Sequence, residues 1–214
     1  MPSWLVRLGL VNIAGMVGAV LAGTPEGWLA LALFDVWFLS ELRLEVRSGT
    51  SSGAEEDRGS RMVLTVIRDV SLLAPVWWAT QQGPAVVRPA TMIVGLLAFA
   101  LGLGIRLGAM RCLGSHFTMA LTRQAHHTLL TEGLYRRMRH PGYLGLILIY
   151  GSFSFVCGLS DVGVVVALVS LAGMLYRIRL EERLLLHTFG GRYVDYRRRT
   201  WALFPRFGSE DVKL

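Results

Sequence analysis

Long apolar runs separated by polar connections dominate the sequence of this 214-residue chain. A helix crosses about 30 Å of hydrocarbon with about 20 apolar residues, because each residue adds about 1.5 Å. The pattern therefore predicts six membrane-spanning helices. Asp35 and the neighbours Arg68 and Asp69 interrupt two of the runs, so five spans are the alternative. The runs cover residues 8–22, 28–42, 63–80, 91–107, 143–159 and 162–176.

The first run has features of a signal peptide, because Arg7 precedes it and small residues end it. The second run starts after only five intervening residues. We therefore expect the two runs to form a helical hairpin that stays in the protein.

The composition agrees with a membrane protein. Hydrophobic residues make up 53% of the chain and charged residues 17%, and the mean hydropathy is +0.47. These values are too apolar for an ordinary water-soluble domain. The net charge of +7 comes from arginine, since Lys213 is the only lysine. Such a surplus indicates nucleic acid or a membrane surface, and the apolar runs favour the membrane. We expect no nucleic-acid partner.

The arginines predict an orientation. With a cytosolic N-terminus, the connections 43–61 and 106–139 and the tail from residue 177 are cytosolic, and with Arg7 they hold 20 of the 22 basic residues. That asymmetry obeys the positive-inside rule for a multi-pass protein with both termini in the cytosol.

The predicted fold is an all-α, polytopic membrane helix bundle of two regions. Residues 1–107 form an N-terminal four-helix membrane region with a cytosolic loop at 43–62. Residues 108–214 form the C-terminal region, which contains a helical hairpin at 142–177 and cytosolic interfacial helices. The aromatic and arginine residues of the tail suit such a helix, and residues 201–205 are expected to fold back onto the bundle.

The chain re-enters lipid through the segment RRMRHPGYLG at residues 136–145. Pro141 suits the first turn of a helix, which places His140 just outside it. The unpaired N–H groups and the positive dipole end of that helix favour an anion such as a carboxylate. Gly142 and Gly145 share a face and allow a close approach to the backbone. The alternative is that His140 caps the helix and the glycines pack another helix.

The last run leaves the membrane as YRIRLEER at residues 176–183. Helical spacing allows Arg177 to pair with Glu181 and Arg179 with Glu182. A solvated helix face is one interpretation. The other is a site, because ionisable groups that face a bundle interior at a membrane boundary usually have a function.

These segments together resemble the isoprenylcysteine carboxyl methyltransferase family and its phospholipid methyltransferase relatives. The resemblance covers residues 129–205: EGLYRRMRHPGYLG, a hairpin, RIRLEERLLLHTFGGRYVDY and a late proline. Leu134 departs from it, since many relatives have proline there. The DRGS sequence at 57–60 is similar to bacterial members, which makes a prokaryotic cytoplasmic membrane the expected location.

The resemblance implies an integral membrane methyltransferase that uses S-adenosylmethionine and releases S-adenosylhomocysteine. The implied acceptor is lipophilic and enters from the bilayer, such as the carboxylate of a prenylated cysteine. A phospholipid amine and a small thiol are the alternatives within the family. The cofactor pocket carried over from the family consists of Leu129, Leu130, Gly133, Tyr135, His140, Pro141, Tyr143, Gly145, Glu181 and Glu182.

Elementary chemistry supports this pocket. The donor is a sulfonium with an ammonium and a carboxylate, so a glutamate can pair with a cationic part and His140 can hold the carboxylate. In-line displacement needs little acid or base; it needs the nucleophile about 3 to 3.5 Å from the methyl carbon and a site without water. The expected catalytic residues are Arg177 and Glu181, because the fork of Arg177 can orient an acceptor carboxylate. Arg139 is the other candidate to anchor the cofactor carboxylate, and the sequence does not separate the two arginines.

Other polar residues suggest two further interpretations. A metal site would have to use His126, His127, His140 and Cys112, whose spacing fits no standard zinc pattern, so no metal is expected. A transporter or a non-catalytic membrane partner would use the charges at Asp35, Glu41, Arg68 and Asp69. The chain has no halves of inverted hydropathy, which argues against a transporter built from repeats.

Overall fold

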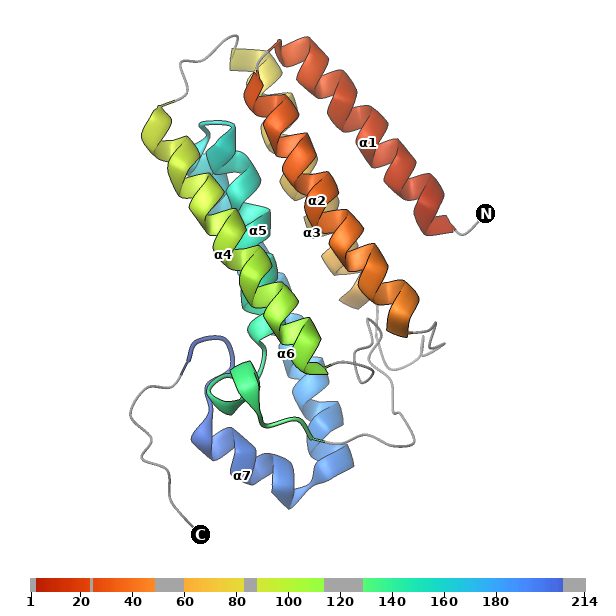
Figure 1. Cartoon of the computed structure of the whole chain (residues 1–214), viewed down its shortest axis with the longest axis vertical. Coiled ribbons are helices and arrows are strands. Elements are labelled where there is room, and N and C mark those ends of the chain that lie inside the picture. The colour runs from red at the N-terminus through yellow and green to blue at the C-terminus, as the bar shows by residue number, and fades with distance from the viewer. Residues whose placement is uncertain (1–2, 24, 49–59, 83–87, 114–128, 206–214) are drawn as a thin grey trace.

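A computed structural model describes residues 3–23, 25–48, 60–82, 88–113 and 129–205. In these ranges the chain is helical without a β-strand, and one isolated bridge joins Met138 and Trp201. The predicted all-α class is confirmed. Figure 1 shows the elements: α1 (Ser3–Ala22), α2 (Pro25–Ser48), α3 (Ser60–Gln82), α4 (Pro89–Leu113), the short 3-10 helix η2 (Gly133–Arg136), α5 (Pro141–Val156), α6 (Ser160–Phe189) and α7 (Gly191–Arg199).

Each predicted run corresponds to one helix. The first four helices contain their predicted runs and extend beyond them, by up to six residues at the C-terminal ends of α2 and α4. The last two helices end at other positions than predicted. The fifth run was expected to reach residue 159, but α5 ends at Val156, where Gly158 adopts a φ of 76° and turns the chain. The sixth was expected to end at residue 176, but α6 continues to Phe189. Its charged half follows its apolar half without a break, since residues such as Leu, Arg and Glu all favour a helix.

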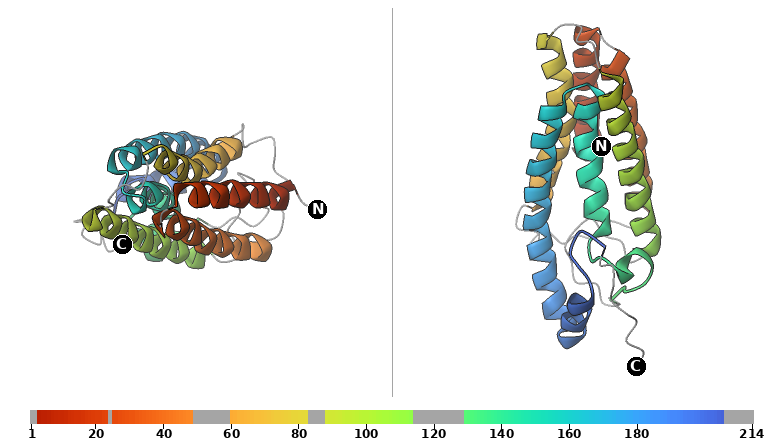
Figure 2. Two further views of the ribbon diagram at one scale, coloured as in Figure 1. Left: turned by 90° about the horizontal axis from the view of Figure 1, so that it is seen from above. Right: turned by 90° about the vertical axis from the view of Figure 1, so that its left-hand side faces the viewer.

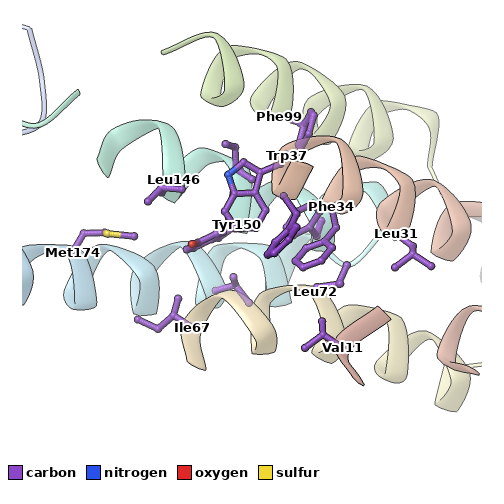
Figure 3. Packing of buried hydrophobic residues seen from close by; sticks show 14 residues of the cluster. Val11, Leu31, Phe34, Trp37, Ile67, Leu72, Phe99, Leu146, Tyr150 and Met174 are labelled. Carbon is purple, nitrogen blue, oxygen red and sulfur yellow. The ribbon is translucent and has the colours of Figure 1, made fainter. Parts of the chain in front are cut away.

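Helix α5 lies at the centre of the bundle. It packs on α2, α3, α4 and α6, and α1 packs on α2 and α3 (Figure 2). Aromatic residues of α2 and α5 fill the core in Figure 3, where the rings of Trp37 and Tyr150 meet edge to face at 5.5 Å. Phe34, Ile149 and Phe153 are fully buried. This packing holds α5 firmly, so the residues at its start have a fixed place.

The outer faces of the helices are apolar. Large hydrophobic side chains stand exposed on α4 and α6, among them Leu97, Leu101, Val165 and Leu168. Two helices in the described part of the chain, α4 and α6, are long and apolar enough to cross a membrane, and α5 is a shorter apolar helix. An apolar exterior of this extent fits a lipid environment.

The polar elements gather at one end of the bundle. The last residues of α2 and α4 and the first residues of α3 and α5 lie at the lower end in Figure 1, beside η2 and α7. The start of α4, which follows Arg88 in the chain, is at the opposite end. The helix termini next to the arginine-rich connections therefore lie at the same end of the bundle, as the predicted orientation requires.

Glycines bring α4 and α5 into backbone contact. A Cβ added to Gly145 would lie 2.7 Å from the carbonyl oxygen of Gly102 and 3.0 Å from the amide nitrogen of Arg106. Neither backbone atom can move aside without separating the helices.

We expect Gly145→Ala to lower the free energy of unfolding by about 1 to 3 kcal/mol, as overpacking does in other cores. Thermal unfolding in detergent measures the change. The control is Gly104→Ala on α4, since a Cβ there meets nothing within 4 Å. Equal unfolding temperatures for the two variants would contradict the close approach.

Candidate active site

The start of α5 is fixed by the chain that follows α7. Pro141 is the first helical residue and His140 precedes it with non-helical dihedrals, φ −128° and ψ 56°, as predicted. The amide of Arg139 donates to the carbonyl of Trp201 at 2.8 Å, and the amide of His140 donates to the carbonyl of Ala202 at 2.9 Å. Residues 201–205 thus fold back as expected, and they hold the histidine in place.

The carboxylate of Glu182, on α6, contacts three basic side chains from outside α6. Its Oε1 accepts from Arg139 Nε at 2.7 Å and lies 3.4 Å from His140 Nε2. Its Oε2 lies 3.7 Å from Arg197 Nε of α7. The helical spacing predicted Arg179 as its partner. Arg179 is instead exposed, and the partners seen among the described residues lie outside α6, because this face of α6 turns toward α5 and α7.

Glu181 has a separate set of partners. Its Oε2 accepts from the Tyr143 hydroxyl at 2.6 Å, and that hydroxyl accepts from Arg177 Nε at 2.9 Å. His140 Nδ1 lies 3.8 Å from the same carboxylate oxygen. Arg177 is buried, whereas the Glu181 side chain is 28% exposed. Glu181 therefore keeps a surface that a ligand can reach.

The surroundings shift the pKa values of Glu182 and Tyr135 in opposite directions. Burial would raise the pKa of Glu182, but the hydrogen bonds and charges of His140 and Arg139 outweigh burial and lower it to about 2. Burial and the charge of Glu181 raise the pKa of Tyr135 above its ordinary value. Tyr135 is thus a neutral phenol in the field of Glu181.

Ionised Glu182 stabilises the fold fully above its ordinary pKa of 4.5, and this contribution is lost as the pH falls toward 2. We expect Glu182→Gln to unfold at a lower temperature than the unchanged protein at neutral pH. The gap should close as the pH falls from 4.5 toward 2. Asp195→Asn is the control, since its pair with Arg198 is solvated. A gap that does not change with pH would refute this role.

The structure brings Tyr135, Arg139, His140, Tyr143, Arg177, Glu181 and Glu182 into one cluster at the end of the bundle. Leu129 and Leu130 are half-buried and lead into η2. Gly133 has a φ of 58° and packs η2 against Cys112 of α4. Gly145 lies against α4, so its predicted contact with the cofactor stays a prediction. His126 and His127 lie outside the described residues.

Several residues of the cluster were not found from the sequence. The Tyr196 hydroxyl of α7 donates to the Tyr135 carbonyl at 2.7 Å and ties η2 to α7. Tyr193 is fully buried near Glu182, and its hydroxyl lacks a hydrogen-bond partner among the described residues. The three-residue spacing of these two tyrosines indicates that they share one face of a helix, and this could have predicted that both are buried. The carbonyl of Thr200 accepts from Arg139, and no feature of the sequence predicts this contact.

Charges suited to a transporter are mostly held in pairs. Glu41 pairs with Arg106 at 2.6 Å, and Arg68 pairs with Asp69 at 2.7 Å. Paired charges packed between helices do not line a path across the bundle.

A bundle with an apolar exterior and one charged cluster at its end defines an integral membrane protein with a polar site at the boundary. Comparison with known proteins finds similarity to one such family. Residues 93–187 match the model of the isoprenylcysteine carboxyl methyltransferase (ICMT) family. The resemblance seen in the sequence is confirmed, and it begins earlier than predicted, within α4.

Two relatives are similar over part of their length. The protein-S-isoprenylcysteine O-methyltransferase B of Arabidopsis thaliana is 35% identical over 132 residues, which are 60% of each chain. The protein-S-isoprenylcysteine O-methyltransferase of Mus musculus is 36% identical over 124 residues, 56% of this chain and 43% of that protein. The chain thus spans about half the length of the curated relatives that it matches.

The fold has a solved counterpart in the eukaryotic intramembrane Ras methyltransferase ICMT. The TM-score is 0.63 at 20% identity, and the match covers 93% of this chain and 74% of the other. The likeness extends to the N-terminal helices, which the family match leaves out.

Proposed function

We propose that this chain is an integral membrane methyltransferase that uses S-adenosylmethionine to methylate the carboxylate of a lipophilic acceptor, a prenylated cysteine. One observation carries the proposal. The chain Arg177–Tyr143–Glu181 lies beside the cluster Arg139–Glu182–His140, where α5 begins and α6 leaves the bundle. The family match and the relatives' names support it.

In this proposal the six long helices cross the membrane and both termini are cytosolic. The gathering of arginine-rich helix ends at one end of the bundle supports this orientation. We place the protein in a prokaryotic cytoplasmic membrane, following the similarity of residues 57–60 to bacterial members. The cofactor then reaches the cluster from the cytosol, and the acceptor reaches it from the bilayer.

The residues of the cluster fit the cofactor that the family implies. Glu181 offers a partly exposed carboxylate to a cationic group. The positive end of the α5 dipole, beside the His140 ring, favours a carboxylate. His140 is 4% exposed, and its Nε2 faces Glu182 Oε1 at 3.4 Å. When bound, the cofactor supplies a methyl group on a positively charged sulfur.

The chain's own residues supply position and a dry environment. Arg177 is 4% exposed, and its planar fork suits a carboxylate held in one orientation. Tyr143 fixes Arg177 Nε, and Glu181 fixes Tyr143. Burial of this chain of hydrogen bonds keeps water from the acceptor, which strengthens the attraction between opposite charges.

The arrangement also supports different roles for the two arginines. Arg139 binds Glu182 and the Thr200 carbonyl, so its donors are used to hold Glu182 and the C-terminal segment. We therefore assign the acceptor carboxylate to Arg177 and a positioning role to Arg139.

Calorimetric titration of the purified protein with S-adenosylhomocysteine tests the cofactor site. We expect saturable binding at one site per chain, and an absence of binding would remove the enzyme function. Labelled S-adenosylmethionine with a farnesylated cysteine, a phosphatidylethanolamine or a small thiol then tests the acceptor. Label in the farnesylated cysteine alone supports the carboxylate; label in either of the others replaces it.

A further inference from the structure

An ion pair is buried between α2 and α4, away from Glu181 and Glu182. Arg106 Nε donates to one carboxylate oxygen of Glu41 at 2.6 Å, and Nη2 donates to the other at 2.8 Å. Each residue is only 6% exposed. The two-point contact fixes the plane of the guanidinium.

Stability alone gives no sufficient reason for such a pair. Removing two charges from water costs much of what their attraction returns, and apolar replacements of buried pairs are often neutral or stabilising. The cost also applies to charges among membrane helices. The contacts of Arg106 with neighbouring helices therefore indicate what the pair does.

Arg106 lies across the first turn of α5. Its third nitrogen, Nη1, is 3.5 Å from the carbonyl oxygen of Gly142. A Cβ on Gly142 would come within 2.8 Å of that nitrogen, and one on Gly145 would lie 3.0 Å from the Cβ of Arg106. The two glycines thus leave room for Arg106 as well as for the backbone of α4.

The residues on either side of Gly142 reach the charged cluster. His140 lies near both glutamates, and Tyr143 joins Glu181 to Arg177. All of them belong to one turn of chain, so a shift of Gly142 moves His140 and Tyr143 together. A displacement near 1 Å is enough to lower an enzymatic rate about a hundredfold.

We propose that Glu41 and Arg106 form a positioning pair: Glu41 orients the guanidinium, and Arg106 sets the place of the first turn of α5. The pair contacts neither cofactor nor acceptor. It connects the N-terminal region to the charged cluster through one side chain. Its kinetic consequences rest on the proposed function, whereas its structural consequence does not.

The test replaces both charges at once, by Glu41→Leu with Arg106→Met. We expect a folded protein with an unfolding temperature equal to or above that of the unchanged chain. The amides of Gly145 and Leu146, in the first turns of α5, should exchange with deuterium about tenfold faster, because that turn is no longer held. The dissociation constant of S-adenosylhomocysteine should rise about tenfold, and kcat should fall while the acceptor KM stays within about threefold.

Two further variants sharpen the result. Arg106→Lys keeps a charge for Glu41 but lacks the fork, so it should fold and keep only part of the slow exchange in α5. Arg68→Met with Asp69→Leu is the matched control, since that pair lies on α3 and its two members contact each other at 2.7 Å. It should leave exchange in α5 unchanged.

The positioning role is overturned if the double variant exchanges its α5 amides, and binds S-adenosylhomocysteine, as the unchanged protein does. If the unchanged protein binds no S-adenosylhomocysteine, the proposed function fails, and the exchange measurement still decides the role of the pair. If the double variant does not fold, the exchange of Arg106→Lys decides: slow exchange there overturns the proposal, and faster exchange supports it.

Discussion

Glu181→Gln is expected to weaken the binding of S-adenosylhomocysteine by about 10- to 100-fold. Glutamine has the shape of glutamate, and its oxygen can still accept from the Tyr143 hydroxyl, so the cluster should keep its geometry. The charge is what is lost, and hydrogen bonds to charged groups contribute about 1.5 to 3 kcal/mol. Calorimetric titration of both proteins in the same detergent measures the change.

The control for this variant is Glu132→Gln, since Glu132 is exposed just before η2. It removes the same charge near the same end of the bundle without touching the cluster. Equal affinities for Glu181→Gln and Glu132→Gln would show that Glu181 does not contact the cofactor. The site would then have to be moved to Glu182 and His140.

Arg177→Lys is expected to reduce turnover about 100-fold and to change the affinity for S-adenosylhomocysteine by less than about threefold. Lysine keeps the positive charge but replaces a planar fork with a single point of contact, so the acceptor carboxylate loses its orientation. The hydrogen bond to Tyr143 also changes. Single-turnover methyl transfer to a farnesylated cysteine, beside calorimetry, separates the two effects.

Arg179→Lys is the matched control, because Arg179 lies two residues further along α6 and is exposed. Its turnover should equal that of the unchanged protein. If Arg177→Lys weakens cofactor binding and leaves single-turnover transfer intact, Arg177 belongs to the cofactor, and the roles assigned to Arg139 and Arg177 must be exchanged.

The separate partners of the two glutamates explain why adjacent carboxylates do different things. Arg139, His140 and the C-terminal segment around Thr200 enclose Glu182, which makes it a structural centre that ties α5, α6 and α7 together. Glu181 faces Tyr143 and remains partly exposed. Successive positions on a helix point about 100° apart, so neighbours in sequence meet different elements.

Local rules were enough to determine the helices and the start of α5. The lengths of the apolar runs gave the six long helices, and the fixed φ of Pro141 placed His140 at the boundary, because both depend on covalent geometry and short-range contacts. The sequence also brought the segments at 136–145 and 176–183 to attention through their spacing.

Tertiary packing decided which charges far apart in the sequence meet. Glu182 pairs with Arg139, 43 residues earlier in the chain, and Arg106 reaches Glu41 across 65 residues. Pairing by helical spacing favoured Arg179 for Glu182, because sequence distance says nothing about which face of α6 turns inward. The charges of this chain are sorted by the approach of α4 and α6 to α5, and glycines and buried aromatic side chains set that approach.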